Sequence, residues 1–328
     1  MPERIDSIEA ALTDWPTIEA VEHGDDVLLA VHDAALVDHL QTIWDRWGQY
    51  GTDRVVPYLF PTHGLLGDLP LREPTAPHAA AGRYCYDTMT LVGPGTWEAA
   101  RGAIDVALTC ADVVGDGVVY GLTRPPGHHA TRSAYGGSCY LNNAAVCAQA
   151  LRQSGHQRVA ILDIDAHHGN GTQDVFYARG DVLYGSVHVD PGAGWFPHYA
   201  GFPQETGIGA GRDANVNIPL PPGTTDGPWI DAVAALVQCA RDFAATALVV
   251  SLGVDAAAED PESPLEVTHE GYREAGHLIG SLAIPTVAMQ EGGYHLPTLG
   301  SLVRATLEGL GAAAASVREL RGNRQDGT

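Results

Sequence analysis

Short apolar runs and longer segments of helical periodicity alternate along this chain. Apolar runs of strand length predict buried β-strands, and apolar residues that recur every three or four positions predict amphipathic helices. The predicted strands are residues 26–31, 118–122, 159–162, 182–187, 216–220, 247–252 and 285–289. The predicted helices are residues 34–47, 95–114, 141–152, 228–244, 269–282 and 296–320. This alternation predicts an α/β fold with a mostly parallel central sheet that helices flank on both faces.

The length of 328 residues allows one large domain or two smaller ones. No internal repeat and no linker divides the chain, so we expect a single domain over residues 1–328. Residues 48–82 are rich in Pro and Gly and lack regular periodicity. Such a long stretch is either an active-site rim or subunit contact, or a meandering surface segment. The tail, residues 321–328, is expected to be frayed.

The chain is strongly acidic, with a formal net charge of −22. Nucleic acids and anionic membranes would repel such a protein, so neither is expected as a partner. Cationic small molecules are more favourable partners for a protein with this charge. All 18 basic residues are Arg. The absence of Lys excludes a phosphate-loop lysine and a Schiff-base lysine from the chemistry.

The cysteines are scattered, odd in number and without a C-x-x-C pair. A disulfide framework or a cysteine zinc site is therefore not expected, and a reducing cytoplasm fits. The N-terminus has acidic residues and no apolar core of signal-peptide length, and no stretch reaches the roughly 18 apolar residues of a membrane helix. The predicted location is the cytoplasm.

Polar side chains with chemical potential follow the predicted strands. The apolar run 159–162 leads directly into Asp163-Ile-Asp-Ala-His-His-Gly-Asn, and other candidates follow three further strands. Ligands in open α/β sheets gather beyond the carboxyl ends of the strands. We therefore expect His128, Asp165, Asp255 and Tyr294 to converge on one rim.

Asp165 and His167 form a pair of ligands suited to zinc or a similar divalent ion. Asp255 is the natural third ligand, because it ends a strand and follows a Gly that allows close approach of the backbone. Three protein ligands leave a coordination position open, which is typical of a catalytic rather than a structural zinc site.

The remaining candidates supply acid–base chemistry. His128 and His129 follow two prolines on a stiff loop and can act as base and then acid. Asp163 and Asn170 are placed to fix the tautomers of these histidines, and Tyr294 can donate its hydroxyl to a developing oxyanion. Each motif alone has an ordinary explanation, such as a turn or a helix cap. The joint pattern carries the prediction.

Five segments together resemble the zinc-dependent histone deacetylase superfamily in the order of its motifs. They are residues 124–130, 136–143, 163–173, 251–261 and 291–294. Residues 82–95 and Glu291 are more similar to the acetylpolyamine amidohydrolase branch than to the histone-directed enzymes. The resemblance implies a single deacetylase-like catalytic domain with an arginase/deacetylase-like fold.

The resemblance assigns roles that agree with those argued from the residues. It implies zinc ligands at Asp165, His167 and Asp255, and a tandem catalytic pair with a transition-state tyrosine. The implied catalytic set is His128, His129, Tyr294, Asp163 and Asn170, where Asn170 stands at a position that is a second Asp in some members. A potassium ion would bind through backbone oxygens near the zinc, with the ligand residues Asp163, Asp165, His167, Ser186 and Val187.

The resemblance also implies a substrate channel walled by two aromatic side chains. Phe196 matches one wall, whereas the other falls on Ser138, which is not aromatic. The mouth is therefore expected to be wider and more polar than a narrow acyl-lysine slot. Gly137 and Gly292 complete the implied substrate-binding residues.

These observations predict a zinc-dependent amidohydrolase that removes an acetyl group from an N-acetylated amine. The negative charge favours a small cationic substrate, such as an acetylpolyamine, over an acetyl-lysine protein or peptide. Two rivals remain: a two-manganese ureohydrolase, which would need further carboxylates, and a catalytically silent member that binds a ligand or partner. A homodimer through residues 48–82 is expected from the resemblance.

Overall fold

The computed structural model describes residues 2–50 and 53–325. At its centre lies a six-stranded sheet in the order β1-β6-β5-β2-β3-β4, and every neighbouring pair is parallel. In sheet order, the strands are Val118–Gly121, Thr286–Gln290, Ala247–Leu252, Val159–Asp163, Val182–Val189 and Asn215–Leu220. The predicted α/β class with a parallel sheet is confirmed.

Helices connect the strands and cover both faces of the sheet. In chain order they are α1 Glu3–Ala11, α2 Asp26–Val31, α3 Ala34–Trp47, α4 His63–Leu66, α5 Pro77–Ala80, α6 Thr96–Val113, α7 Asn143–Gln153, α8 Asn170–Phe176, α9 Asp226–Asp242, α10 His269–Gly280 and α11 Leu296–Gln325. The helices α2, α3, α6 and α7 share one apolar core, and α1, α9, α10 and α11 share the other.

Strand β2 shows how the two cores are divided. Val159 and Ile161 belong to the core under α7, whereas Ala160 and Leu162 belong to the core under α9. This follows from the two-residue alternation of side chains along a strand. Both faces are buried because helices cover them, so the strand is a continuous apolar run that ends at Asp163.

One prediction of local structure was wrong. Residues 26–31, expected as a strand, form helix α2, which packs against α7. Leu28 and Val31 lie three positions apart and are fully buried, which suits a helix, but six mostly apolar residues are too few to distinguish the two periodicities. Helix α11 extends to Gln325, and the last residues of the tail that was expected to fray, 326–328, lie outside the described residues.

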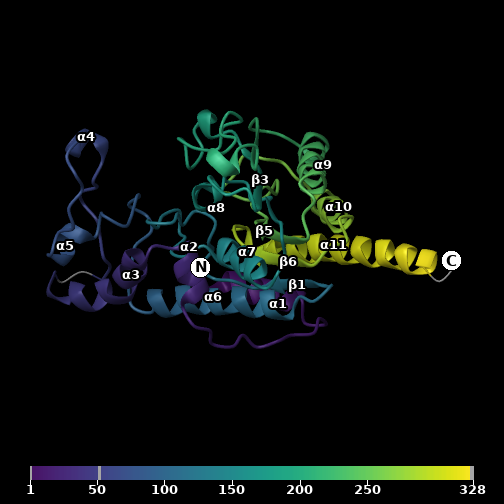
Figure 1. The fold of residues 1–328 in the computed structure, drawn as a ribbon, viewed down its shortest axis with the longest axis horizontal. Coiled ribbons are helices and arrows are strands. Elements are labelled where there is room, and N and C mark those ends of the chain that lie inside the picture. Colours follow the sequence, from purple (N-terminus) through teal and green to yellow (C-terminus); the bar gives the residue numbers. More distant parts are fainter. Residues whose placement is uncertain (1, 51–52, 326–328) are drawn as a thin grey trace.

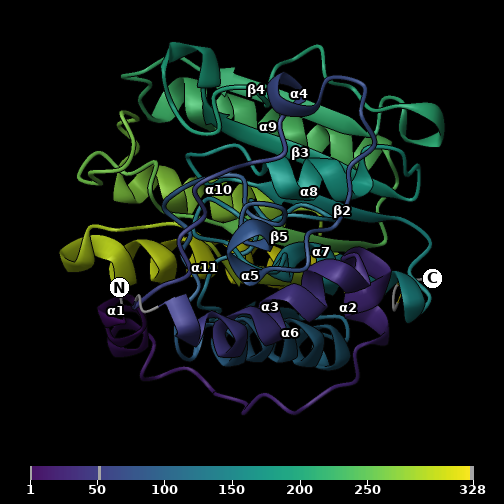
Figure 2. The ribbon, with the colours of Figure 1, turned by 90° about the vertical axis from the view of Figure 1, so that its left-hand side faces the viewer.

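Residues 53–82, here called the projecting segment, contain the short helices α4 and α5. Figure 1 shows them on the left, away from the C-terminal end of α11, and in Figure 2 they face the viewer. The segment lines an open pocket of about 470 Å³, mainly with Leu, Pro and Phe side chains. Its large exposed apolar side chains are Val56, Tyr58, Leu59, Leu65, Leu69 and Leu71.

The helices that the structure describes over residues 2–50 and 53–325 include none with the length and apolar character needed to cross a membrane.

Candidate active site

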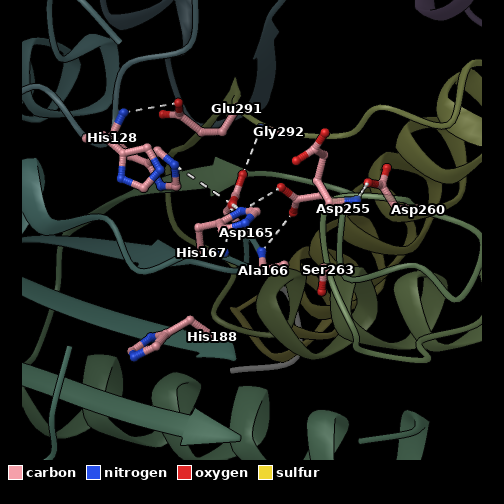
Figure 3. A network of polar contacts seen from close by, with 12 residues as sticks. His128, Asp165, Ala166, His167, His188, Asp255, Asp260, Ser263, Glu291 and Gly292 are labelled. Atoms are coloured by element: carbon pink, nitrogen blue, oxygen red, sulfur yellow. Dashed lines mark hydrogen bonds and ion pairs between the residues drawn. The ribbon is translucent and has the colours of Figure 1, made fainter. Parts of the chain in front are cut away.

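Three candidate metal ligands meet beyond the carboxyl ends of β2 and β5. The Nδ1 atom of His167 lies 3.3 Å from Oδ1 of Asp165 and 3.1 Å from Oδ2 of Asp255. One ligand atom from each of the three residues lies within 4.8 Å of the other two. Figure 3 shows the three side chains pointing toward one another, Asp165 and His167 from the loop after β2 and Asp255 from the loop after β5. The structure therefore brings together the three residues that the sequence singled out.

The sheet explains why these residues meet. Strands β2 and β5 are neighbours, and Asp163 is paired with Ser251 in their register. The two chains therefore leave the sheet side by side. A Cβ atom at Gly253 would lie 2.0 Å from Oδ2 of Asp165, and one at Gly292 would lie 2.2 Å from Oδ2 of Asp255. Only glycine leaves room for the two carboxylates at these positions.

Backbone N–H groups hold the two carboxylates in place. Asp255 accepts a hydrogen bond from the N–H of Ala166 at 2.8 Å through Oδ1, which leaves Oδ2 facing His167. Asp165 accepts from the N–H of Gly292 at 2.7 Å through Oδ2 and from the N–H of His167 at 2.9 Å through Oδ1. These contacts join three loops around one point.

The two tandem histidines stand beside the ligand cluster, with ring centroids 4.0 Å apart. His128 Nδ1 lies 3.1 Å from Oδ2 of Asp163, and His129 Nδ1 lies 2.9 Å from Oδ1 of Asn170. An oxygen acceptor at Nδ1 fixes the proton there and leaves Nε2 of each ring for chemistry. Asp163 also accepts from the hydroxyl of Tyr184 at 3.1 Å.

The different partners push the two histidine pKa values apart. Burial alone would lower the pKa of His128, but the charges of Asp165 and Asp163 outweigh it and raise that pKa to about 10. Burial, with the charge of His128, holds the pKa of His129 well below its usual range. The neutral Asn170 does not offset this as a carboxylate would. The pair therefore combines one charged imidazole with one neutral imidazole.

Tyr294 follows Gly292 and Gly293 on the loop after β6. Its backbone N–H donates to Oδ2 of Asp260 at 2.6 Å, which anchors the loop. Burial, with the charges of Asp255 and Asp165, raises the pKa of the Tyr294 hydroxyl well above its usual range. The phenol therefore stays protonated and can act as a hydrogen-bond donor near those carboxylates.

Arg4 was not anticipated from the sequence, yet it binds the backbone of the loop that carries Tyr294, here called the tyrosine loop. This buried side chain of α1 donates from Nε to the carbonyl oxygen of Gly293 at 2.6 Å and from an Nη atom to the carbonyl oxygen of Glu291. Its guanidinium lies 5.1 Å from the centroid of the Tyr294 ring. No local pattern in the sequence connects residues so far apart in the chain.

Glu291 was noted only for family similarity, and it proves to be a fully buried carboxylate. Its Oε2 accepts hydrogen bonds from the N–H groups of Gly127 at 2.6 Å and His128 at 3.1 Å. Burial raises the pKa of Glu291 to about 7, although the charge of His128 opposes the rise. Its ligand atom lies within 4.8 Å of those of His128 and Cys139, a second possible metal group.

The two residues predicted to wall a substrate channel, Phe196 and Ser138, lie on segments that contact His129. The Phe196 ring stands edge-on to the His129 ring, with centroids 4.7 Å apart. A Cβ atom at Gly137 would lie 2.5 Å from the same imidazole, so the Gly137–Ser138 turn also lies against it. Ser138 adopts φ 64°, and its side chain is exposed. The Gly137–Ser138 turn therefore carries a small, polar and exposed side chain.

The residues expected to bind potassium lie on β2 and β3 and the loop after β2. Ser186 is paired with Asp163 in the parallel register, so both lie at the same edge of the sheet. The Ser186 hydroxyl lies 2.8 Å from Nδ1 of His188, and Val187 is fully buried.

The donor set suits a divalent cation. Two carboxylates and one imidazole are borderline-hard ligands of the kind that Zn²⁺ accepts. Burial, with the charge of Asp165, raises the pKa of Asp255 to about 6, which reflects the cost of burying two carboxylates together. A bound cation would offset this cost. The residues present therefore fit a zinc ion.

Comparison with known proteins agrees with the family resemblance of the sequence motifs over nearly the whole chain. Residues 1–310 match the model of the histone deacetylase domain. An acetylpolyamine amidohydrolase from Mycoplana ramosa is 41% identical over 296 residues, which cover 89% of this chain and 85% of the relative. One from Burkholderia pseudomallei is 42% identical over 95% of this chain and 91% of the relative. The crystal structure of the acetylpolyamine aminohydrolase from Burkholderia pseudomallei superposes with a TM-score of 0.88 over 95% of this chain and 91% of that chain, at 42% identity. The chain thus belongs to the histone deacetylase domain family.

Proposed function

We propose that this protein is a zinc-dependent amidohydrolase that removes the acetyl group from a small N-acetylated polyamine. The observation that carries the proposal is the convergence of Asp165, His167 and Asp255 beside a charged and a neutral histidine. Relatives at about 40% identity that bear the name acetylpolyamine amidohydrolase support the substrate class.

Asp165, His167 and Asp255 would hold the metal. A zinc ion bound there supplies Lewis-acid chemistry: it polarises an amide carbonyl and lowers the pKa of a water molecule. The chain's own contribution to this site is geometric. Backbone N–H groups and close-fitting glycines fix the carboxylates, which reduces the reorganisation needed during the reaction.

The histidines divide the proton transfers. His129, held neutral, takes a proton at Nε2 from the attacking water and later delivers it to the nitrogen of the leaving amine. His128, kept as an imidazolium by Asp163, stabilises the negative charge that develops on the substrate. The Tyr294 hydroxyl donates a hydrogen bond to the same developing oxyanion. Acetate and a free amine are the products.

A cationic substrate suits the charge of the protein and the polar Ser138 side of the channel. The formal net charge of −22 attracts an ammonium group, and an exposed serine leaves more room than an aromatic wall. The alternative is an acetyl-lysine peptide, which carries a bulky backbone on both sides of the reacting side chain.

Substrate preference decides between these alternatives. Values of kcat/KM should be measured side by side for acetylputrescine, acetylspermidine, acetylcadaverine and acetyl-lysine peptides on zinc-reconstituted protein. We expect the acetylpolyamines to lead. A preference for peptides of about tenfold or more, equal to about 1.4 kcal/mol, would reject the polyamine assignment.

Three further properties belong to the proposal. A homodimer would form through the projecting segment, whose exposed Leu and Tyr side chains are unusual on a monomer surface. A potassium ion near Asp163, Ser186 and Val187 remains a prediction from family resemblance. The free cysteines fit a cytoplasmic location. Metal analysis that finds about one zinc ion per chain would exclude the two-manganese ureohydrolase alternative.

A further inference from the structure

A buried polar network lies beneath the loop that joins β3 to β4. This loop, residues 190–214, carries Phe196 and leaves the sheet at the same edge as the metal ligands. Polar side chains from β3, β4 and α8 reach its inner side. These side chains are not part of the ligand cluster, and Figure 3 shows His188 set apart from it at the end of its strand.

Glu205, within this loop, is the centre of the network. Its Oε2 atom accepts a hydrogen bond from Nε2 of Gln173 at 2.7 Å and from the N–H of Gly201 at 2.9 Å. The Gln173 contact ties the loop to α8, and the Gly201 contact closes the loop on itself. A carboxylate that accepts several N–H donors forms stronger hydrogen bonds than a neutral acceptor.

Gln173 in turn binds strand β4 of the sheet and so connects the loop to it. Its Oε1 atom accepts from Nδ2 of Asn215 at 2.9 Å and from Nδ2 of Asn217 at 2.8 Å, both on β4. The amide of Asn217 also lies 3.2 Å from the carbonyl oxygen of Phe202. Gln173 and the two asparagines are buried, so each lost contact would leave a polar atom without a partner.

A second tie holds the middle of the loop. His188 donates from Nε2 to the carbonyl oxygen of Gly201 at 2.8 Å, while its Nδ1 lies 2.8 Å from the hydroxyl of Ser186. Gly201 has φ 106°, and a Cβ atom there would lie 2.7 Å from Cγ of His168. The loop therefore sits directly on the two imidazoles, with both the N–H and the C=O of Gly201 engaged.

The loop held in this way presents Phe196 to the catalytic pair. Only four residues separate Phe196 from Gly201, so the anchored turn restricts where the phenyl ring can stand. That ring lies 4.7 Å from the His129 ring. A displacement of the loop would widen the channel without moving the metal ligands, which belong to other loops.

We propose that Glu205, acting through Gln173 and Gly201, is a positioning residue that fixes the Phe196 wall and so sets which acylated amine fits the channel. The inference rests on the proposed function for its substrate readout. The anchoring itself can be tested without catalysis, because hydrogen exchange of the loop amides reports it directly.

The test compares four variants with the wild type. Glu205→Ala removes the acceptor, and Glu205→Asp keeps the charge but withdraws it by one methylene group. Glu205→Gln can place its amide oxygen where Oε2 stands. Gln204→Ala, at the exposed neighbour on the same loop, is the matched control. The measurements are hydrogen exchange of residues 194–207, KM and kcat on the acylated-amine panel, and Tm.

In Glu205→Ala and Glu205→Asp we expect exchange of the loop to rise about tenfold and KM for the preferred amine to rise by a similar factor, the net size of about one intramolecular hydrogen bond. The value of kcat should stay within about threefold, and selectivity across the panel should fall. Glu205→Gln should restore most of both properties, and Gln204→Ala should match the wild type.

Unchanged exchange and KM in Glu205→Ala and Glu205→Asp would overturn the proposal. So would a Glu205→Gln variant as impaired as Glu205→Ala, because the loss would then not come from the hydrogen bonds. If the wild type deacetylates no amine on the panel, the proposed function fails. The exchange measurements would still decide whether Glu205 anchors the loop.

Discussion

Two regions of the molecule differ in burial and in polar contacts: the strand-end cluster of Asp165, His167 and Asp255, and the projecting segment. The two carboxylates of the cluster are at most 1% exposed, and backbone N–H groups bind each of them. In the projecting segment, Tyr58 and Leu69 are about 70% exposed. A buried charge needs several partners, so few sequences can build the cluster. An exposed apolar surface has no such requirement.

We expect substitutions in and around the cluster to affect chemistry strongly, whereas those in the projecting segment should leave chemistry almost unchanged and test the proposed dimer contact.

Tyr294→Phe removes the hydroxyl while leaving the ring in place. We expect kcat to fall by about two to three orders of magnitude, the loss typical of one oxyanion donor. Zinc affinity should not change, because the three ligands are untouched. Single-turnover kinetics and metal titration check both statements. Turnover equal to the wild type would show that Tyr294 has no part in the reaction.

Arg4→Ala tests whether a distant helix supports the cluster. The variant loses two donors to the carbonyl oxygens of Glu291 and Gly293, so we expect kcat to fall about tenfold and the protein to lose about 2 kcal/mol of unfolding free energy. Glu9→Ala, on the exposed face of α1, is the control. If both variants behave alike in kcat and denaturant unfolding, the tyrosine loop does not depend on Arg4.

Asn170→Asp tests the electrostatic difference between the two histidines. A carboxylate at position 170 would favour the charged form of His129 and raise its pKa, which burial now holds low. The base must be neutral to accept a proton, so the acidic limb of the kcat/KM profile should move up by about one pH unit. A profile that does not move, or that moves down, would contradict the assignment of His129 as the base.

Leu69→Ser tests the projecting segment. The side chain is exposed, so we expect unfolding free energy to change by less than about 0.5 kcal/mol and kcat/KM by less than about threefold. Light scattering should show the dimer shifting toward monomer, with Asp68→Ser as the neighbouring control. Unaltered molar mass at micromolar concentration would argue against a dimer contact here.

The same contrast explains what the sequence could predict. Asp165, Asp255 and His128 were identified because each follows an apolar run, and the parallel sheet brings the ends of such runs together. Arg4 was missed because its partners are backbone carbonyl oxygens almost 290 residues away, which no residue pattern marks. Glu291 did carry a signal, since a carboxylate that directly follows a buried strand needs a partner.

Prediction of local structure failed where the pattern of apolar residues was short or irregular. Helix α2 has only six residues, too few to separate helical from strand periodicity. The projecting segment is rich in Pro and Gly, and its two helices have four residues each, so backbone turns determine its path more than side-chain burial does. The role of Glu205 was not predicted either. Its partners lie on α8 and β4 and become its neighbours only in the folded protein.

The proposed chemistry depends on one divalent cation bound among Asp165, His167 and Asp255. Anomalous diffraction at the zinc edge from zinc-reconstituted crystals tests it most directly. We expect one strong peak per chain at zinc-ligand distances of about 2.0 Å from the three side chains. A peak among other residues, a second peak of equal strength close by, or no peak after reconstitution would contradict it.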